Sequence, residues 1–316
     1  MMELAVTHRN PIAFFFDFAK KYLSVIWLPG KPLFLGFMLL SLAGLSACRH
    51  EDPPDHPTVL RVGLLPDEAA EVIFARHIPL FAYLEQETGI RFDLIVPDSY
   101  SGLMNMFKYG KVDLAYFGGL SFITTHRSSN AVPLVSRDSD TQFTSLFITH
   151  ANNDLKTIRD FKGMPLTFGS RRSTSGHLMP RYFLSRQDII PEEFFSAVDY
   201  TASHDKAIQA VLEQKFDLGA INPMIYQRMV ADGRIAKGDI RIVWETPPYI
   251  NYVWAVQPAM NAATRERLAT AFLKLNPAIA EHRAILSNLD AQHFLRADIV
   301  DFAALEFVAD SLQLLK

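Results

Sequence analysis

From residue 59 onward, segments typical of strands alternate with segments typical of helices, and this order restricts the fold more than any other feature. Residues 59–65 form a β-rich run. Residues 68–89 follow with Ile73, Ile78, Phe81 and Leu84 at helical spacing and a glycine as the stop. The alternation predicts an α/β fold in which mostly parallel sheets are covered by helices on both faces. Further strands are expected at 91–96, 112–117, 165–169, 216–221 and 240–244, and further helices at 100–109, 176–185, 205–214, 263–275, 277–286 and 302–315.

An internal echo indicates that the fold contains two such units. Residues 110–116 (GKVDLAY) resemble residues 214–220 (QKFDLGA), and each segment follows a predicted helix. Recurrence by chance is the alternative interpretation. Because the surrounding order of helices and strands also repeats, we expect two α/β lobes built on related plans.

The chain has one cysteine in 316 residues, so no disulfide can form within it and the fold depends on its core. Cys48 directly follows the apolar residues 32–47, and Lys31 precedes them. This pattern is typical of a bacterial lipoprotein signal, which is cut before a cysteine that then receives a lipid. The apolar segment is shorter than the ~20 residues of a membrane span. The alternative is a small buried hydrophobic residue.

These features predict an exported chain that is tethered to a membrane by lipid at Cys48. Residues 1–48 would be an N-terminal extension followed by the signal peptide, and the polar, proline-containing residues 49–57 would be a linker. The aromatic-rich residues 1–28 have two open interpretations. They result from a wrongly chosen start codon, or they are a second membrane-associating segment.

Charge and motif content exclude several classes of function. The formal net charge is −3, which does not suit a nucleic-acid binder, since such domains carry a basic patch. The ten histidines are scattered without metal-ligand spacing, and no nucleophile elbow, phosphate-loop lysine motif or dinucleotide fingerprint is present. We therefore expect no catalytic residue, no metal and no cofactor. His204 and Asp205 are the one His-acid neighbour of interest, but adjacent side chains point in different directions.

The segment 168–177 (FGSRRSTSGH) carries the sharpest chemical signal. A predicted strand ends there, small hydroxyl residues follow, and a helix begins. Helix starts expose N–H groups without partners and a positive dipole end, so the segment predicts a receptor for an oxyanion or carboxylate. Ordinary capping by Ser173 or Thr174 is the alternative. Arg171 and Arg172 could pair with the ligand, although loop arginines are more often solvated.

Three other segments could line a site at the carboxyl ends of strands. Residues 115–121 (AYFGGLS) offer Tyr116 and Phe117 as a wall, or form a core strand and a tight turn. In residues 65–68 (LPDE), Asp67 is most simply a helix N-cap. Residues 246–254 (TPPYINYVW) combine two prolines with three aromatic residues. They suggest a crossover between lobes that also lines a cleft, or a buried aromatic strand.

Over nearly all of residues 58–316, these segments resemble the substrate-binding proteins of ABC importers for phosphate, phosphite and phosphonate. The likeness is greatest to the group labelled putative selenate-binding. It rests on residues 65–68, on 112–115 with 117–119, on 132–135 with Arg137, and on 246–249 with Tyr252. Above all it rests on the long string 173–182 (STSGHLMPRY).

The resemblance implies a two-lobed type II periplasmic binding protein with its ligand in the cleft between the lobes. Lobe one would comprise 58–147 and 248–316, and lobe two 148–247, with hinge segments near 145–150 and 244–249. Ser173, Thr174 and Ser175 would hold ligand oxygens. The other implied ligand-binding residues are Tyr116 and Phe117 on the opposite wall, His177, the pair His204 and Asp205, and Tyr249, Asn251 and Tyr252 in a hinge strand.

This chain departs from its relatives at the hinge, where Asn251 stands in place of a frequent aspartate, and at Phe117, where phosphonate binders have a tyrosine. A buried acid accepts a hydrogen bond from a protonated oxyanion, whereas asparagine also donates. We therefore expect this site to disfavour protonated ligands and to tolerate fully ionised ones such as selenate or sulfate.

The sequence thus predicts a monomeric, non-enzymatic binding protein on the periplasmic side of a bacterial membrane. It would capture a small tetrahedral oxyanion and deliver it to an ABC permease and its ATPase. A sensor that reports ligand occupancy to a membrane kinase or chemoreceptor is the first alternative. An enzyme on the same scaffold is the second.

Overall fold

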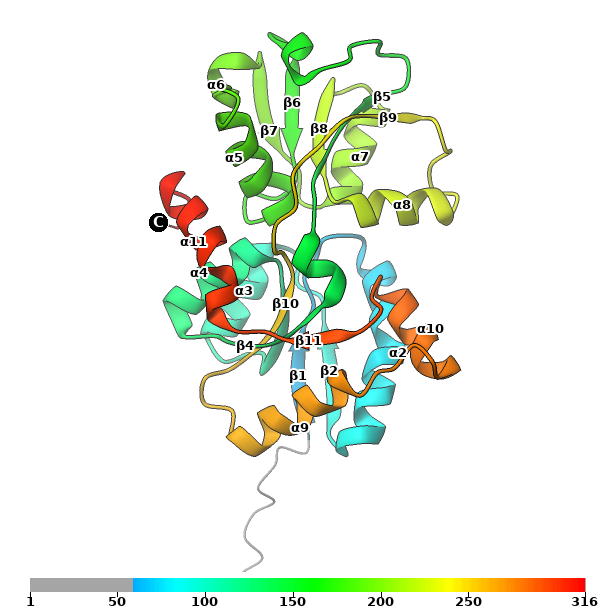
Figure 1. The fold of residues 1–316 in the computed structure, drawn as a ribbon, viewed down its shortest axis with the longest axis vertical. Coiled ribbons are helices and arrows are strands. Elements are labelled where there is room, and N and C mark those ends of the chain that lie inside the picture. The colour runs from blue at the N-terminus through cyan, green and yellow to red at the C-terminus, as the bar shows by residue number, and fades with distance from the viewer. Residues whose placement is uncertain (1–58, 316) are drawn as a thin grey trace, which may run out of the picture. The chain divides into compact units, whose positions relative to one another are not determined.

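The computed structural model describes residues 59–315, which form two β-sheets flanked by helices (Figure 1). The predicted two-lobed α/β fold is confirmed. The first sheet has the order β11-β4-β10-β3-β1-β2. Its strands are β1 (Val59–Gly63), β2 (Arg91–Ile95), β3 (Leu114–Phe117), β4 (Val132–Arg137), β10 (Val253–Val256) and β11 (Phe294–Arg296).

The second sheet is built from the middle of the chain and has the order β7-β6-β8-β5-β9. Its strands are β5 (Leu146–His150), β6 (Pro165–Phe168), β7 (Ala197–Tyr200), β8 (Leu218–Ile221) and β9 (Ile240–Glu245). Both sheets are mixed rather than mostly parallel. β1 pairs in parallel with β2 and β3, and β6 with β7 and β8, whereas β10 and β5 run antiparallel to both of their neighbours.

Helix α2 shows how the first core forms. Its described turns bury Ile73, Leu80, Phe81 and Leu84, and Gly89 ends it in the left-handed conformation that glycine adopts at low cost. Ile78, another residue of the expected helical pattern, is instead 55% exposed. The lobe-one helices are α2 (Ala70–Thr88), α3 (Tyr100–Lys108), α4 (Gly119–Ser129), α9 (Ala262–Leu273), α10 (Ala280–Asn288) and α11 (Ala303–Ser311).

The second sheet buries a separate apolar cluster on each face. Alternation along β5 explains this, because Leu146 and Ile148 enter one cluster while Phe147 enters the other. Residues of α7 and α8 contribute to the first cluster, and Leu184 of α5 to the second. The helical elements of lobe two are η4 (Ile158–Phe161), η5 (Thr174–Leu178), α5 (Met179–Ser185), α6 (Pro191–Phe194), α7 (His204–Leu212) and α8 (Pro223–Ala231).

Within residues 59–315 the chain passes from one sheet to the other in segments 138–145 and 246–252. The two segments pair in antiparallel fashion, since Phe143 and Tyr249 exchange backbone hydrogen bonds of 2.8 Å in both directions. The expected hinge near 145–150 lies almost entirely in β5, whereas most of the expected hinge near 244–249 coincides with the second crossing. Pro247 and Pro248 restrict the backbone of the second crossing.

The predictions for the N-terminal part lie outside the described residues. They comprise the signal peptide, the lipid attachment at Cys48 and the linker 49–57. Among residues 59–315, no helix combines the length and the apolar character that a membrane span requires.

Candidate ligand site

The loop after β6 carries the expected hydroxyl residues to the start of a helical segment. Ser173 caps η5, and its Oγ accepts a hydrogen bond from Gly176 N at 3.0 Å. Thr174 and Ser175 form the first turn and are buried. η5 has π-helical hydrogen bonding, which is common at functional sites, and it continues into α5. The first N–H groups of such a segment lack helical partners.

Two glycines keep this loop compact. Gly169 N donates to Gly176 O at 2.8 Å, so the end of β6 and the start of the helix are in backbone contact. A Cβ atom on Gly176 would lie 2.8 Å from His204 Cε1 and 3.0 Å from Gly169 Cα. Only glycine therefore fits at position 176.

The start of α4 in lobe one meets the start of η5 in lobe two. Leu120 N donates to Thr174 Oγ1 at 2.8 Å, which joins the two lobes directly. Gly119 N approaches Asn251 Oδ1 of the second crossing at 3.4 Å. Two positive helix ends thus converge on one buried point between the lobes, an arrangement that favours an anion.

Three buried side-chain donors around this point have no hydrogen-bond partner. They are Tyr100 Oη, Ser175 Oγ and Asn251 Nδ2, on residues that are at most 2% exposed. Asn251 lies beside Gly118 and Gly119. Burial raises the pKa of the Tyr100 phenol well above its ordinary value, and the neighbouring Ser173 opposes that rise. The two hydroxyl groups are therefore close together, but they do not form a hydrogen bond. Unpaired buried donors are costly, so such a cluster indicates that an acceptor belongs there.

His204 orients the hydroxyl group of Ser173, the residue that caps η5. Asn222 N donates to His204 Nδ1 at 3.1 Å, so Nδ1 carries no proton. Burial lowers the pKa of His204 to about 4, so the ring is neutral near pH 7 and its proton is on Nε2. Nε2 lies 3.3 Å from Ser173 Oγ, to which it donates. Because Ser173 Oγ also accepts from Gly176 N, its own proton is free to point at a ligand.

An aromatic and polar wall completes the site on the lobe-one side. The rings of Tyr116 and Tyr252 stack at 5.1 Å, and the Arg137 guanidinium lies over both. Tyr252 Oη accepts from Asn222 Nδ2 at 2.8 Å and donates to Asp67 Oδ2 at 3.0 Å. This chain of hydrogen bonds links both lobes to the second crossing.

Seven of the expected site residues gather at this junction, and four lie beside it. Phe117 packs in the lobe-one core against Phe107. His177 uses both ring nitrogens within lobe two, since Nδ1 donates to Arg171 O at 2.8 Å and Nε2 lies 3.1 Å from Arg181 Nε. The seven are Tyr116, Ser173, Thr174, Ser175, His204, Asn251 and Tyr252, and the other two outside are Asp205, bonded to Ser203, and Tyr249, bonded to Ser145.

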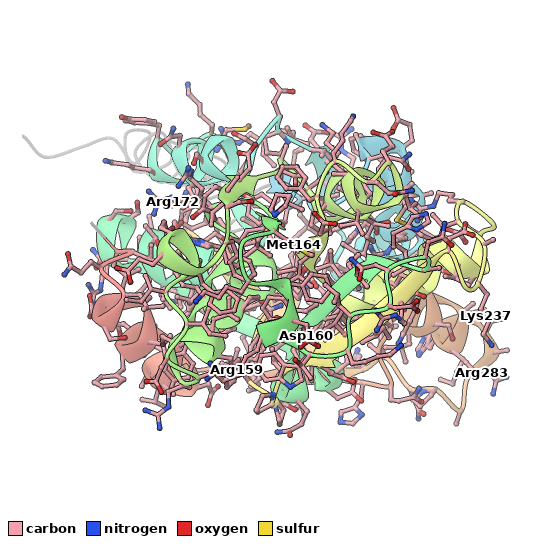
Figure 2. All side chains as sticks on the ribbon, turned by 90° about the horizontal axis from the view of Figure 1, so that it is seen from above. Arg159, Asp160, Met164, Arg172, Lys237 and Arg283 are labelled. Carbon is pink, nitrogen blue, oxygen red and sulfur yellow. The ribbon has the colours of Figure 1, made fainter. Side chains whose placement is uncertain are left out.

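The two loop arginines are also engaged outside the site. The Arg171 guanidinium stacks on the Tyr200 ring with 3.6 Å to its centroid. Arg172, labelled in Figure 2, donates through Nη1 to Leu314 O at 3.2 Å. An anion at the junction would therefore meet neutral donors and helix ends rather than these two cations.

Three residues that the sequence did not single out as ligand contacts belong to the junction, namely Asp67, Tyr100 and Asn222. The interpretation of Asp67 as the N-cap of α2 is wrong, because Ala69 is the cap and Asp67 is buried against lobe two. Tyr100 could have been identified from the sequence, because it is the first residue of the helix that follows β2. Asn222 opens α8 after β8 in the same way.

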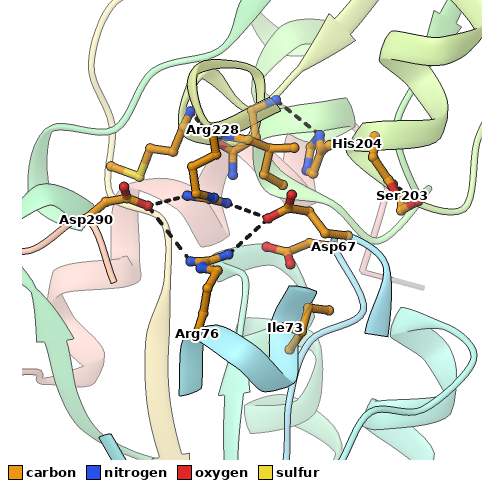
Figure 3. A network of polar contacts seen from close by, with 12 residues as sticks. Asp67, Ile73, Arg76, Ser203, His204, Arg228 and Asp290 are labelled. Carbon is orange, nitrogen blue, oxygen red and sulfur yellow. Dashed lines mark hydrogen bonds and ion pairs between the residues drawn. The ribbon is translucent and has the colours of Figure 1, made fainter. Parts of the chain in front are cut away.

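A cluster of charges joins the lobes beside this junction (Figure 3). The fully buried carboxylate of Glu68 accepts from Arg76 at 3.0 Å, from Arg228 at 2.6 Å and from Arg234 at 3.0 Å. Arg76 belongs to α2, whereas Arg228 and Arg234 belong to lobe two. Asp290 binds Arg228 as well. Within residues 59–315, no group of three His, Cys, Asp or Glu side chains is arranged to hold a metal ion.

Two relatives and one solved structure match most of this chain. The "Probable ABC transporter phosphite binding protein PhnD1" of Prochlorococcus marinus is 28% identical over 290 residues, which cover 88% of this chain and 98% of the relative. The "Phosphate-import protein PhnD" of Mycolicibacterium smegmatis is 25% identical and covers 72% of this chain and 77% of its own. The structure of PhnD1 from P. marinus with methylphosphonate superposes with a TM-score of 0.77 at 27% identity, covering 82% of this chain and 99% of that one.

The family model for the periplasmic phosphonate-binding protein of ABC transporters matches residues 62–302. These proteins bind a substrate for transport and are not enzymes. The resemblance to phosphate, phosphite and phosphonate binders is therefore confirmed, whereas the narrower likeness to the selenate-labelled group stays a prediction. The chain belongs to the family of periplasmic substrate-binding proteins of phosphonate ABC transporters.

Proposed function

We propose that this chain captures a small tetrahedral oxyanion of the phosphonate, phosphite or phosphate type at the junction between its lobes. It hands the anion to an ABC permease and its ATPase, and it is held at the membrane by lipid on Cys48. The ligand contacts are Tyr100, Ser173, Thr174, Ser175 and Asn251, with His204 orienting Ser173. The relatives that bind phosphite or import phosphate, and the neighbour with bound methylphosphonate, support this ligand class.

The three buried donors without partners carry this proposal. Tyr100, Ser175 and Asn251 each present an O–H or N–H. Ser175 lies in the first turn of η5, Asn251 beside the start of α4, and Tyr100 near Ser173. A tetrahedral oxyanion offers several acceptors directed to different sides, so one small ligand satisfies all three. A cationic or purely apolar ligand would leave them unpaired.

Thermal unfolding against a panel of anions tests the proposal. The panel comprises methylphosphonate, aminoethylphosphonate, phosphite, phosphate, sulfate, selenite and selenate. A ligand at ~100 times its Kd adds ~2.7 kcal/mol, which raises the unfolding midpoint by roughly 5–10 °C at this size. Ser175→Ala is expected to leave the free protein as stable as before, because it removes an unpaired hydroxyl, and to raise the Kd about 10- to 100-fold.

Ser185→Ala is the matched control, since Ser185 is exposed at the end of α5. It is expected to change neither the midpoint nor the ligand-induced shift. Absence of a shift with every anion would reject the oxyanion site. An equal shift in Ser175→Ala would remove Ser175 from it. Sulfate and selenate test the expectation from Asn251, which is wrong if neither of them binds.

The anchor is tested by Cys48→Ser in a bacterial host. The unaltered chain is expected to sediment with membranes, and the variant to remain in the supernatant, because a serine cannot receive the thioether-linked lipid. Release of both forms into the supernatant would contradict the anchor. The ligand-induced shift should be the same in both, because residue 48 is not among the proposed ligand contacts.

A further inference from the structure

Asp67 is a buried carboxylic acid that the oxyanion-binding contacts do not use. Its residue is 6% exposed, and its Oδ2 accepts one hydrogen bond, from Tyr252 Oη at 3.0 Å. Among residues 59–315 it forms no ion pair, since the nearby arginines bind Glu68 instead. Buried acids are normally paired with a cation, so an unpaired one calls for another explanation.

Asp67 belongs to the same junction as the unpaired donors. Its backbone carbonyl accepts from His204 N at 3.0 Å, and the His204 ring contacts Ser173. Burial raises the phenol pKa of both Tyr100 and Tyr116, and the neighbouring Asp67 raises it further. The acid therefore adds an acceptor to a site whose other free groups are donors.

We infer that Asp67 selects ligands that carry a proton, by accepting a hydrogen bond from the protonated oxygen of a phosphonate, phosphite or phosphate. The inference rests on the proposed function, because it concerns the same site. Asn251 donates and takes an ionised oxygen, whereas Asp67 accepts and takes a hydroxyl. A phosphonate monoanion satisfies both residues. Sulfate or selenate, which has no proton near pH 7, satisfies only Asn251. The role of Asp67 therefore opposes the preference for fully ionised ligands that Asn251 alone predicts.

The surroundings of Asp67 agree with this role. Burial raises the pKa of the Asp67 carboxyl and the Glu68 charge raises it further, while Arg76 and Arg228 and the Tyr252 hydroxyl oppose the rise. The other titratable groups near it do not change charge around pH 7: burial raises the pKa of Tyr100 and Tyr252 well above 10, and that of His204 is lowered to about 4. The bound complex therefore holds one proton between Asp67 and the ligand.

This proton predicts how affinity depends on pH. Once the pH exceeds the pKa values of both the ligand and Asp67, binding requires proton uptake, and the affinity for methylphosphonate falls about tenfold per unit of pH. Asp67→Asn keeps an oxygen that accepts from Tyr252, so the fold is retained, but it cannot take up the proton. Its Kd for methylphosphonate is expected to lack that alkaline fall, and its affinity for sulfate to rise about tenfold or more.

The experiment is a calorimetric titration of wild type and Asp67→Asn with methylphosphonate and with sulfate across the second ionisation of methylphosphonate. Asp93→Asn, at an exposed position of β2, is the control and is expected to follow wild type. If wild type binds methylphosphonate and both pH profiles coincide, the proposed function stands and the role of Asp67 is overturned. If no form binds either anion or any other member of the panel, the proposed function fails and the role of Asp67 with it.

Discussion

Replacement of Gly176 by alanine is expected to abolish ligand binding and to lower the free energy of unfolding by about 2–3 kcal/mol. The added Cβ would lie 2.8 Å from the His204 ring and 3.0 Å from Gly169 Cα. Neither neighbour is the far end of a flexible side chain, so the loop and the ring must move apart. Displacement of the oxyanion contacts by about 1 Å costs on the order of 100-fold in a preorganised site.

Chemical denaturation and ligand titration of Gly176→Ala measure these two effects. Gly118→Ala is the matched control for stability, because its Cβ would meet nothing closer than 3.6 Å. That variant is expected to unfold within about 0.5 kcal/mol of wild type. Retention of full affinity by Gly176→Ala would show that the contact between the loop and His204 does not hold the site together.

The secondary structure was largely predictable because it follows local periodicity. α2 and α3 form close to the expected ranges, and Gly89 ends α2 as predicted. Ile78 fits the helical spacing but is exposed, because in that turn the buried face of α2 carries the polar residue His77 instead. α4 was not predicted, since its sequence is rich in Ser and Thr and has only a short apolar stretch.

Strand pairing was not predictable in the same way. An alternation of strands and helices indicates parallel neighbours, but β10 inserts between β3 and β4 from more than a hundred residues away. β5 likewise runs antiparallel between β8 and β9. Both strands adjoin the crossings, so their direction depends on how the chain returns between lobes and not on local sequence.

The candidate site likewise contains residues that local sequence identifies and residues that only tertiary contacts identify. The hydroxyl loop at 173–175 was identifiable because strand, small residues and helix start adjoin in sequence. Asp67 and Asn222 were missed as site residues because their roles arise from contacts across the lobes. Asp67 O accepts from His204 N of lobe two, and Asn222 Nδ2 of lobe two donates to Tyr252 Oη. Residue type alone made Asp67 an obvious helix cap. In the structure α2 begins at Ala70 with Ala69 as its cap, so Asp67 lies before the helix and does not cap it.

Removal of the Glu68 side chain is expected to cost about 3–5 kcal/mol of folding stability and to open the lobes. Glu68→Ala would leave three arginines around an empty buried position, of which Arg228 and Arg234 come from lobe two. Because the closed arrangement is then less populated, the apparent Kd for the ligand rises in proportion. Denaturation, small-angle X-ray scattering and ligand titration measure the three effects.

The dependence of stability on pH separates this network from simple loss of packing. Burial alone would raise the pKa of Glu68, but Arg228 and Arg76 outweigh it and hold the pKa below the ordinary 4.5. A lowered acid pKa contributes stability above the unfolded value and loses it as the pH falls through the folded value. The stability difference between wild type and the near-isosteric Glu68→Gln is therefore expected to be full at pH 7 and to shrink below about pH 4.5. Glu87→Ala, which removes a solvent-exposed pair with Lys274, should cost less than about 1 kcal/mol. If Glu68→Ala cost no more than Glu87→Ala, the charges would not be what holds the lobes together.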